Sequence, residues 1–103
     1  MPADDVLLRL KTALSERYGS RLARVVLYGS RARGDHGPES DYDVAVFLRG
    51  ELSFWDEAGA LADIEVRVLD ETGALVHALP FRDTAYHDRT AFMGEVRRDG
   101  HAI

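Results

Sequence analysis

The sequence predicts an α/β or α+β fold in which helices flank a small three-stranded sheet. Apolar runs of strand length alternate along the chain with segments whose apolar residues recur at helical spacing. The chain has 103 residues, of which 46% are hydrophobic and 30% charged, and this size and balance are typical of one compact domain. We therefore expect residues 1–103 to form a single domain.

The N-terminal half is predicted to contain one long helix and two strands. Apolar residues recur at helical spacing over residues 4–18, with one of the two leading aspartates as the N-cap and Gly19 as the stop. Residues 25–28 are β-branched or large and end at a glycine, and residues 42–48 form a second apolar run of strand length. The polar, glycine-containing residues just before the second run predict a loop.

The C-terminal half is predicted to contain three helices and one strand. A capping-box pattern at its start predicts a short helix over residues 53–61. Over residues 64–69 apolar residues alternate with charged ones, and this period of two predicts the third strand, with Glu65 on the face opposite the apolar residues. Helices are then expected over residues 71–78 and 88–98.

The charge balance and the absence of cysteine exclude several classes of function. The chain carries 18 acidic and 13 basic residues, a net charge of −5, so it lacks the cationic surface that drives non-specific nucleic-acid binding. The absence of cysteine excludes disulfides, thiolate catalysis and cysteine-ligated metal sites. No apolar run approaches the roughly 20 residues that span a bilayer, and the N-terminus does not resemble a signal peptide. We expect a cytoplasmic protein that binds neither membranes nor nucleic acid directly.

Two aspartates at the start of the second predicted strand are the first candidate site. Asp41 and Asp43 lie two residues apart, so their carboxylates are expected on the same face of the strand. Two like charges at the entrance to an apolar strand are unfavourable unless a cation neutralises them. Oxygen ligands of this kind suit Mg²⁺ or Mn²⁺, which take their remaining ligands from water and a substrate phosphate. The pair therefore predicts a metal site that acts on a phosphorylated substrate.

The turn after the first predicted strand supplies a candidate phosphate site. Gly29 allows the backbone to approach a ligand closely, and Ser30 offers a hydroxyl at the start of a helical turn. Arg33 follows Ser30 by three residues and shares its face of that turn, whereas Arg31 is rotated away by about 100°. We therefore predict that Gly29, Ser30 and Arg33 bind the nucleotide phosphates.

Taken together, these two motifs resemble a known family. The pattern of Gly29-Ser30, ten further residues and Asp41-Tyr42-Asp43 resembles the signature of the polymerase-beta-type nucleotidyltransferase superfamily. The run from Gly29 to Gly34, together with the small size of the chain, is similar to the minimal nucleotidyltransferases of that superfamily. The resemblance implies a nucleotidyltransferase fold with a mixed sheet, helices on one side of that sheet, and a nucleoside triphosphate bound with two divalent metal ions.

The resemblance also implies a third carboxylate on a later strand, flanked by apolar residues. Glu65, between Ile64 and Val66, fits this description, with Glu in place of the commoner Asp. Asp41, Asp43 and Glu65 are accordingly expected to be both the metal ligands and the catalytic residues. On the residues alone, Glu65 could equally face solvent, and Asp63 would then be the alternative.

The function implied by the resemblance is transfer of AMP from ATP to a hydroxyl, with Mg²⁺ as the cofactor and Mn²⁺ as a possible replacement. The minimal members are typically encoded beside a helical HEPN protein. The implied acceptor is a tyrosine of that HEPN partner toxin, and the implied role is that of an antitoxin. The alternative is a nucleotide-binding module without catalysis, which neutralises its partner by covering it.

The four histidines carry no functional assignment at this point. They show no paired spacing of the kind that metal ligands require, so surface positions or satisfied polar roles are expected for all of them. These residues are His36, His77, His87 and His101.

Overall fold

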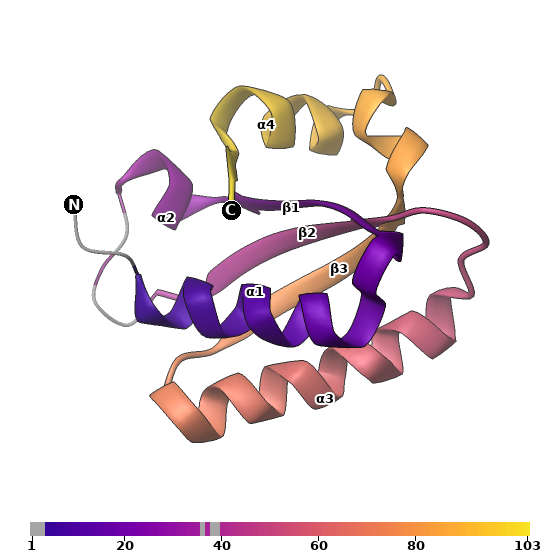
Figure 1. The fold of residues 1–103 in the computed structure, drawn as a ribbon. Helices are drawn as coiled ribbons and strands as arrows, with labels where there is room; N and C mark the ends of the chain where they lie inside the picture. The colour runs from indigo at the N-terminus through magenta and orange to yellow at the C-terminus, as the bar shows by residue number, and fades with distance from the viewer. Residues whose placement is uncertain (1–3, 36, 38–39) are drawn as a thin grey trace.

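The computed structural model describes residues 4–35, 37 and 40–103, and it shows a four-stranded sheet between two layers of helices (Figure 1). The sheet has the order β3-β2-β1-β4. Its strands are β1 (Leu22–Tyr28), β2 (Tyr42–Leu48), β3 (Val76–Arg82) and β4 (His101–Ala102). β1 pairs antiparallel with β2 and β4, whereas β2 and β3 are parallel. The predicted mixed sheet is confirmed, with one strand more than expected because the chain end adds β4.

Helices cover both faces of this sheet. α1 (Asp5–Tyr18) and α3 (Phe54–Thr72) lie on one face, and the 3-10 helix η2 (Asp83–His87) and α4 (Ala91–Asp99) lie on the other (Figure 1). The implied arrangement with helices on one side only is therefore wrong. Two short elements, η1 (Gly19–Arg21) and α2 (Ser30–Arg33), flank the two ends of β1. In the described part of the chain, no helix is long and apolar enough to cross a membrane.

β2 runs through the middle of the sheet and supplies both cores. Its even-numbered residues from Tyr42 to Leu48 are buried in an aliphatic core with α1 and α3. Ala45 and Phe47 belong instead to a second core, which they share with Met93 and Val96 of α4 and with several aromatic rings. Even-numbered side chains of β2 therefore pack against α1 and α3, whereas odd-numbered ones face the layer that contains α4.

The segment from residue 54 to residue 72 is one continuous helix, and the predicted short helix followed by a strand over residues 64–69 is wrong. Leu61, Ile64 and Val68 are buried at spacings of three and four, and together they form the face of α3 that packs on the core. Val66, which the strand prediction placed on the same face as Ile64, is 57% exposed. The alternation was compatible with both periods, and the buried helical stripe decided between them.

The predicted helix over residues 71–78 is also wrong, because α3 ends at Gly73 and β3 follows. Gly73 adopts a left-handed conformation with φ of 78°, and its N–H donates to the carbonyl of Leu69, which stops the helix. β3 is an edge strand, a position that tolerates Pro80, which has no N–H to donate. The strand that lies parallel to β2 is therefore Val76–Arg82.

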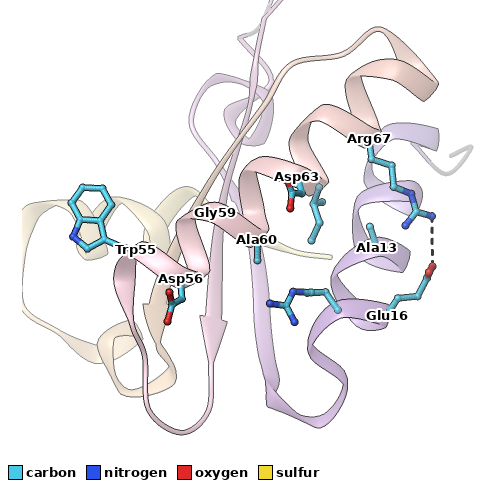
Figure 2. Close-up of a pocket in the computed structure, with 10 residues that line it drawn as sticks. Ala13, Glu16, Trp55, Asp56, Gly59, Ala60, Asp63 and Arg67 are labelled. Atoms are coloured by element: carbon cyan, nitrogen blue, oxygen red, sulfur yellow. Dashed lines mark ion pairs between the residues drawn. The ribbon is translucent and has the colours of Figure 1, made fainter.

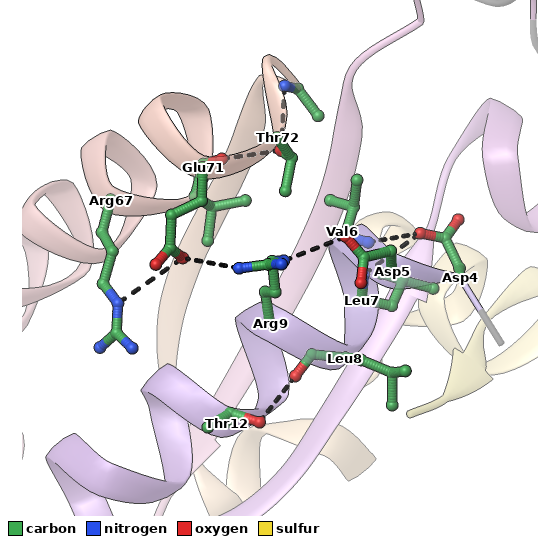
Figure 3. Close-up of polar contacts among 12 residues, drawn as sticks. Asp4, Asp5, Val6, Leu7, Leu8, Arg9, Thr12, Arg67, Glu71 and Thr72 are labelled. Carbon is green, nitrogen blue, oxygen red and sulfur yellow. Dashed lines mark hydrogen bonds and ion pairs between the residues drawn. The ribbon is translucent and has the colours of Figure 1, made fainter.

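α1 begins and ends where its capping residues predict. The carboxylate of Asp4 accepts hydrogen bonds from the N–H groups of Val6 and Leu7 at 2.9 and 3.2 Å (Figure 3). Its second oxygen accepts a 2.9 Å hydrogen bond from the hydroxyl of Tyr42, which fixes the helix start to β2. Gly19, with φ of 54°, ends the helix as expected.

Ion pairs connect α1 and α3 at the surface. Arg9 contacts Asp5 at 3.0 Å and Glu71 of α3 at 3.8 Å, and Arg67 reaches the same Glu71 carboxylate at 3.7 Å (Figure 3). Exposed pairs of this kind contribute little to stability. The two helices are therefore held mainly by their buried faces, which include the fully buried Leu14.

Candidate active site

Three strand ends meet where the sequence places its candidate residues. β1 ends at Tyr28, and both β2 and β3 begin at the same edge of the molecule. The register aligns Tyr28 with Asp43 and Asp43 with His77 across the three strands. Because residues in register project to the same face of a sheet, these three side chains share one face. It is the face that α4 covers, since Tyr28 packs in the core beneath α4.

The structure brings Asp41 and Asp43 together with a histidine. Oδ2 of Asp41 lies 2.8 Å from Nε2 of His77. Burial is the main cause of a raised pKa at Asp43, and the negative charges of Asp41 and Glu95 raise it further. The positive groups of His77 and Arg33 oppose this rise. Asp43 thus lies where partial burial and the nearby negative charges disfavour its ionised form, which raises its pKa.

Gly29 is held against the Asp43 carboxylate by its backbone. It adopts φ of 75°, a conformation that side chains rarely tolerate, and a Cβ atom placed there would lie 2.6 Å from Oδ2 of Asp43. Ser30 follows directly and begins α2, as the sequence predicted. The turn after β1 therefore runs immediately beside the carboxylate pair, and only glycine allows this approach.

The two arginines of α2 contact opposite sides of the sheet. Arg33 ion pairs with Asp35 at 3.2 Å and with Glu95 of α4 at 3.3 Å, and its charge acts on Asp43. Arg31 donates to the carbonyl of Ser40 and lies over the ring of Tyr42, which belongs to the core under α1. Arg33 therefore lies on the same side of the sheet as Asp43, and Arg31 lies on the other; the phosphate contact expected of Arg33 stays a prediction.

Glu65 does not occupy the predicted strand position beside the aspartates. It lies on α3, and its Oε2 accepts a 2.8 Å hydrogen bond from the N–H of Ala78 in β3. This contact satisfies a backbone donor at the open edge of the sheet. Asp63, the alternative, is exposed on the same helix and lines a hollow between α1 and α3. The strand on which Glu65 was predicted to reach the site is absent, because those residues are helical.

His77 is the site residue that sequence reasoning missed. A strand signal was present, because a mostly apolar run, residues 74–79, follows Gly73 and precedes Pro80, as in an edge strand. The helix predicted over the same residues hid that signal. His77 consequently stands where the resemblance implied a carboxylate, on the strand next to Asp43. Of the other histidines, His36 lies outside the described residues.

Two hollows differ in their relation to these residues. One of about 590 Å³ lies between α1 and α3, on the opposite face of the sheet, with Trp55 and Asp56 of α3 and Glu16 of α1 at its border (Figure 2). Its polar groups include an ion pair of Arg67 with Glu16 at 3.6 Å. The other, of about 490 Å³, is lined by residues from α1, from residues 31 and 40–42, and from the end of α3 and the segment that follows it, residues 72–75. Of the candidate site residues, only Asp41 borders this second hollow.

The donor set fits a divalent cation only in part. Asp41 and Asp43 supply the oxygen ligands that Mg²⁺ and Mn²⁺ prefer. Among residues 4–35, 37 and 40–103, however, no three His, Asp or Glu side chains are already grouped closely enough to hold a metal ion. Asp41 and Asp43 thus lie at this edge of the sheet, and among the described residues no third side chain completes a metal-binding group with them.

Comparison with known proteins identifies the family. Residues 7–93 match the family model described as the nucleotidyltransferase domain. Two proteins of Methanocaldococcus jannaschii, each named "putative protein adenylyltransferase", are similar in sequence. One is 29% identical over 96 residues, which is 93% of each chain. The other is 28% identical over 105 residues, covering 100% of this chain and 99% of its own.

Solved structures share the fold. A crystal structure of a toxin–antitoxin with AMP-PNP has a TM-score of 0.69 at 18% identity, covering 92% of this chain and 69% of its own. A mutant of the toxin–antitoxin MntA–HpeT has a TM-score of 0.66 at 15% identity, covering 98% and 72%. A "putative nucleotidyltransferase" from Sulfolobus solfataricus has a TM-score of 0.58 at 19% identity, covering 98% and 87%. Since the family model spans most of the chain, the protein belongs to the nucleotidyltransferase domain family, the class of enzyme that its sequence predicts.

Proposed function

We propose that this protein transfers AMP from ATP to a hydroxyl of a partner protein and releases pyrophosphate. The observation that carries the proposal is the Asp41–Asp43 pair beside the Gly29–Ser30 turn, in a chain of the nucleotidyltransferase family. The names of the two Methanocaldococcus jannaschii relatives support a protein as the acceptor. In the reaction, a bond forms between the hydroxyl oxygen and the α-phosphorus, the bond from that phosphorus to the pyrophosphate oxygen breaks, and the hydroxyl proton is released to water.

The proposed roles of the residues follow from their positions. Asp41 and Asp43 hold the divalent ions, Mg²⁺ or Mn²⁺, which neutralise charge on the phosphate oxygens when bound. Ser30 donates its hydroxyl to a phosphate oxygen, and Gly29 lets the backbone approach the same group. Arg33 exchanges its ion pairs with acidic neighbours for contacts with the departing phosphates. Together these residues align the α-phosphorus with the acceptor and stabilise the leaving group.

We further propose that the acceptor is a tyrosine of a HEPN-type toxin and that residues 1–103 act as one antitoxin domain. The support is the resemblance of the Gly29–Gly34 run to minimal nucleotidyltransferases, together with two structural neighbours whose names describe toxin–antitoxins. Modification of a toxin side chain would account for neutralisation without a large acceptor-binding domain in the described fold.

Co-expression with the protein encoded by a neighbouring gene tests this proposal. Intact-mass and peptide mass spectrometry of the partner should show added AMP with the wild-type chain and at least about 100-fold less with Asp43→Asn, because a metal ligand is lost. Asp88→Asn, which removes an exposed carboxylate between η2 and α4, is the matched control and should act like wild type. A partner that is modified equally by the Asp43→Asn variant would overturn the site assignment.

A second candidate function is neutralisation by binding alone. The observation in its favour is that the Glu65 carboxylate accepts a hydrogen bond from the backbone N–H of Ala78, so that within the described part of the chain no third carboxylate forms a metal-binding group with Asp41 and Asp43. The same experiment separates the two functions. A partner that co-purifies and is inhibited but never carries AMP identifies the binding module, whereas AMP on the partner identifies the enzyme.

A further inference from the structure

We infer that the outward face of α3 binds an amphipathic helix of another protein, one that carries Lys or Arg at every seventh position beside an apolar stripe. The inference goes beyond the proposed function, because such a helix can bind here whether or not AMP is transferred. Two features of α3 carry it, an exposed apolar stripe and a row of aspartates along one side of that stripe.

α3 has a second apolar face in addition to the one that packs on the core. Five residues at alternating spacings of four and three form this face, which is named the α3 seam: Trp55, Gly59, Ala62, Val66 and Leu69. At about 100° per residue they fall within an arc of about 80°, opposite the buried face of the helix. Trp55 is 82% exposed, Val66 57% and Leu69 38%. The spacing is that of the a and d positions of a heptad, which pack against a second helix in coiled coils.

No described helix or strand covers the α3 seam. α1 packs beside α3 and β3 lies against its inner side, so the outward side faces solvent in the described part of the chain (Figure 1). Figure 2 shows Trp55 projecting from the start of α3 on the side away from α1. Contiguous exposed apolar side chains, unlike single ones, mark interaction surfaces. The small Gly59 and Ala62 in the middle of the seam leave room for the side chains of an approaching helix.

A row of three aspartates runs along one side of the α3 seam. Asp56, Asp63 and Asp70 each follow a seam residue directly and lie seven residues apart, at the e positions of the same heptad. All three are exposed, and no hydrogen bond or ion pair joins their carboxylates to another residue that the structure describes. The nearby Arg67 is already paired, with Glu16 at 3.6 Å. The row therefore presents three negative charges beside the seam.

This charge pattern selects the kind of helix that fits. In coiled coils, the residues that flank the apolar positions form ion pairs across the interface and set partner and orientation. Two antiparallel copies of α3 would place the aspartate row of each against that of the other. Two parallel copies would place it against Ala58, Glu65 and Thr72, on the other side of the seam. A second copy thus offers no positive charge in either orientation, whereas a helix with Lys or Arg at the facing positions offers one to each aspartate.

The α3 seam ends near the candidate site but does not cover it. Thr72, the last residue of α3, lines the second hollow together with Asp41. Asp43 lies on the opposite face of the sheet, with Tyr28 and His77. A helix bound along α3 therefore leaves Asp43 accessible.

Fluorescence titration of the full chain with two synthetic peptides tests the charge pattern. Both peptides are three heptads long with Leu at the a and d positions. One carries Arg at the e and g positions and the other Glu, so like charges keep each peptide from pairing with itself. Trp55 is the only tryptophan of the chain, so its emission reports contact with the α3 seam. The Arg peptide should shift this emission to shorter wavelength and bind at least about 10-fold more tightly than the Glu peptide. Equal affinities, or an emission that the Arg peptide does not shift, would overturn the inference.

Two variants show whether the Arg peptide binds at the α3 seam. Val66→Arg places a positive charge within the seam and should weaken binding at least about 10-fold. Asp63→Asn/Asp70→Asn removes two charges of the aspartate row and should weaken binding about 5-fold. Asp56 stays in place because an acidic residue in the first turn stabilises the helix. An affinity that neither variant lowers contradicts the placement on α3.

Matched controls separate this surface from general attraction between an acidic chain and a basic peptide. Leu8→Arg makes the same kind of change at an exposed apolar residue of α1, and Asp83→Asn/Asp88→Asn removes two exposed carboxylates outside α3. Both should bind the Arg peptide within about 2-fold of wild type. Circular dichroism checks that every variant folds. Losses in these controls equal to those in the α3 variants would show attraction without a docking surface.

Analytical ultracentrifugation of the chain alone tests whether a second copy occupies the α3 seam. The inference predicts that wild type and Val66→Arg sediment with the same molecular mass, because the aspartate row disfavours pairing of two copies. A wild-type oligomer that Val66→Arg dissociates would assign the seam to a second copy and reject a basic partner helix.

Discussion

On the face beneath α1 and α3, the side chains that β2 contributes are buried and, apart from the hydroxyl of Tyr42, apolar along its whole length. On the face beneath η2 and α4, the same strand contributes Ala45 and Phe47 at one end and Asp43 at the other. The first face is a closed core, and the second is half core and half polar site. Phe47 marks the core half, with the rings of Phe81 and Tyr86 at 5.6 and 5.5 Å.

This difference shows how a small chain combines stability and a charged site. The burial of Asp43 is incomplete, so its carboxylate stays accessible while its neighbours on the other face carry the packing. Along β2, the even-numbered residues pack in the closed core, whereas the odd-numbered residues face the side that carries Asp43. One strand therefore serves both stability and the site, because alternate residues point to opposite faces. Changes on the two faces should therefore have different consequences, and five experiments examine this.

The largest effect on stability is expected from truncation on the closed face. Leu14 of α1 is fully buried, so Leu14→Ala should lower the free energy of unfolding by about 2–5 kcal/mol through lost burial and a cavity. Leu8 on the same helix is 54% exposed, and Leu8→Ala should change stability by less than about 0.5 kcal/mol. Urea unfolding measures both. Equal costs for the two variants would contradict the description of this face as a closed core.

The next largest effect is expected at the turn beside the site. Gly29→Ala combines a left-handed backbone with a Cβ atom 2.6 Å from Asp43, and it should cost at least about 2 kcal/mol and weaken ATP binding. Gly50→Ala has φ of 85° but nothing within 4 Å of the new Cβ. That control should cost about 1 kcal/mol for backbone strain and leave ATP binding unchanged. If Gly29→Ala loses no more stability than Gly50→Ala, the close approach of the turn to Asp43 has no energetic effect and this prediction is wrong.

A smaller effect, on ligand affinity, should separate the two arginines of α2. Arg33→Ala should weaken binding of ATP with Mg²⁺ by about 1–3 kcal/mol, the range for a charge-assisted contact, whereas Arg31→Ala should weaken it less. The reason is that Arg33 lies on the carboxylate face and Arg31 lies over Tyr42 on the other. Isothermal calorimetry decides between them, and an equal or larger loss at Arg31 would reverse the assignment.

The last effect is absent at neutral pH and appears only at alkaline pH. Tyr18 under α1 and Tyr28 under α4 both have a pKa raised from 10 to about 12, in each case mainly by burial. The unfolded chain loses these protons near pH 10 while the folded chain keeps them, so stability should fall as pH rises from about 10 to about 12. Tyr18→Phe should remove part of this fall and change little at neutral pH, because the ring keeps its packing.

Denaturant unfolding at several alkaline pH values measures this fall, and an undiminished fall in Tyr18→Phe would contradict the burial argument. Absorbance titration with Asp43→Asn adds a test of the two faces. The charge of Asp43 contributes to the raised pKa of Tyr28, whereas that of Glu57 contributes at Tyr18. Asp43→Asn should therefore lower the pKa of Tyr28 and leave that of Tyr18 unchanged.

Much of the site was predictable because its signals are local. Asp43 lies on the apolar strand β2 and Asp41 directly precedes that strand, and Gly29 before Ser30 marks a turn that few other residues allow. His77 was not predictable in the same way. Its place beside Asp43 depends on the pairing of two strands separated by a 19-residue helix, and no local pattern contains that register.

The sequence by itself determined the class of fold, the capped helix α1, the apolar strand β2 with Asp43 in it and Asp41 just before it, and the nucleotidyltransferase family. These features rest on interactions within a few residues along the chain, such as caps, turns and alternation. Only the tertiary structure decided that residues 54–72 are one helix and that β3 follows it. The run from Ile64 to Leu69 satisfies both a helical and a strand period, and burial of Leu61, Ile64 and Val68 against the core selects the helix. Because residues 54–72 are helical, the strand that pairs with β2 is Val76–Arg82. Glu65 therefore lies on α3 at the edge of the sheet, and His77 lies beside Asp41.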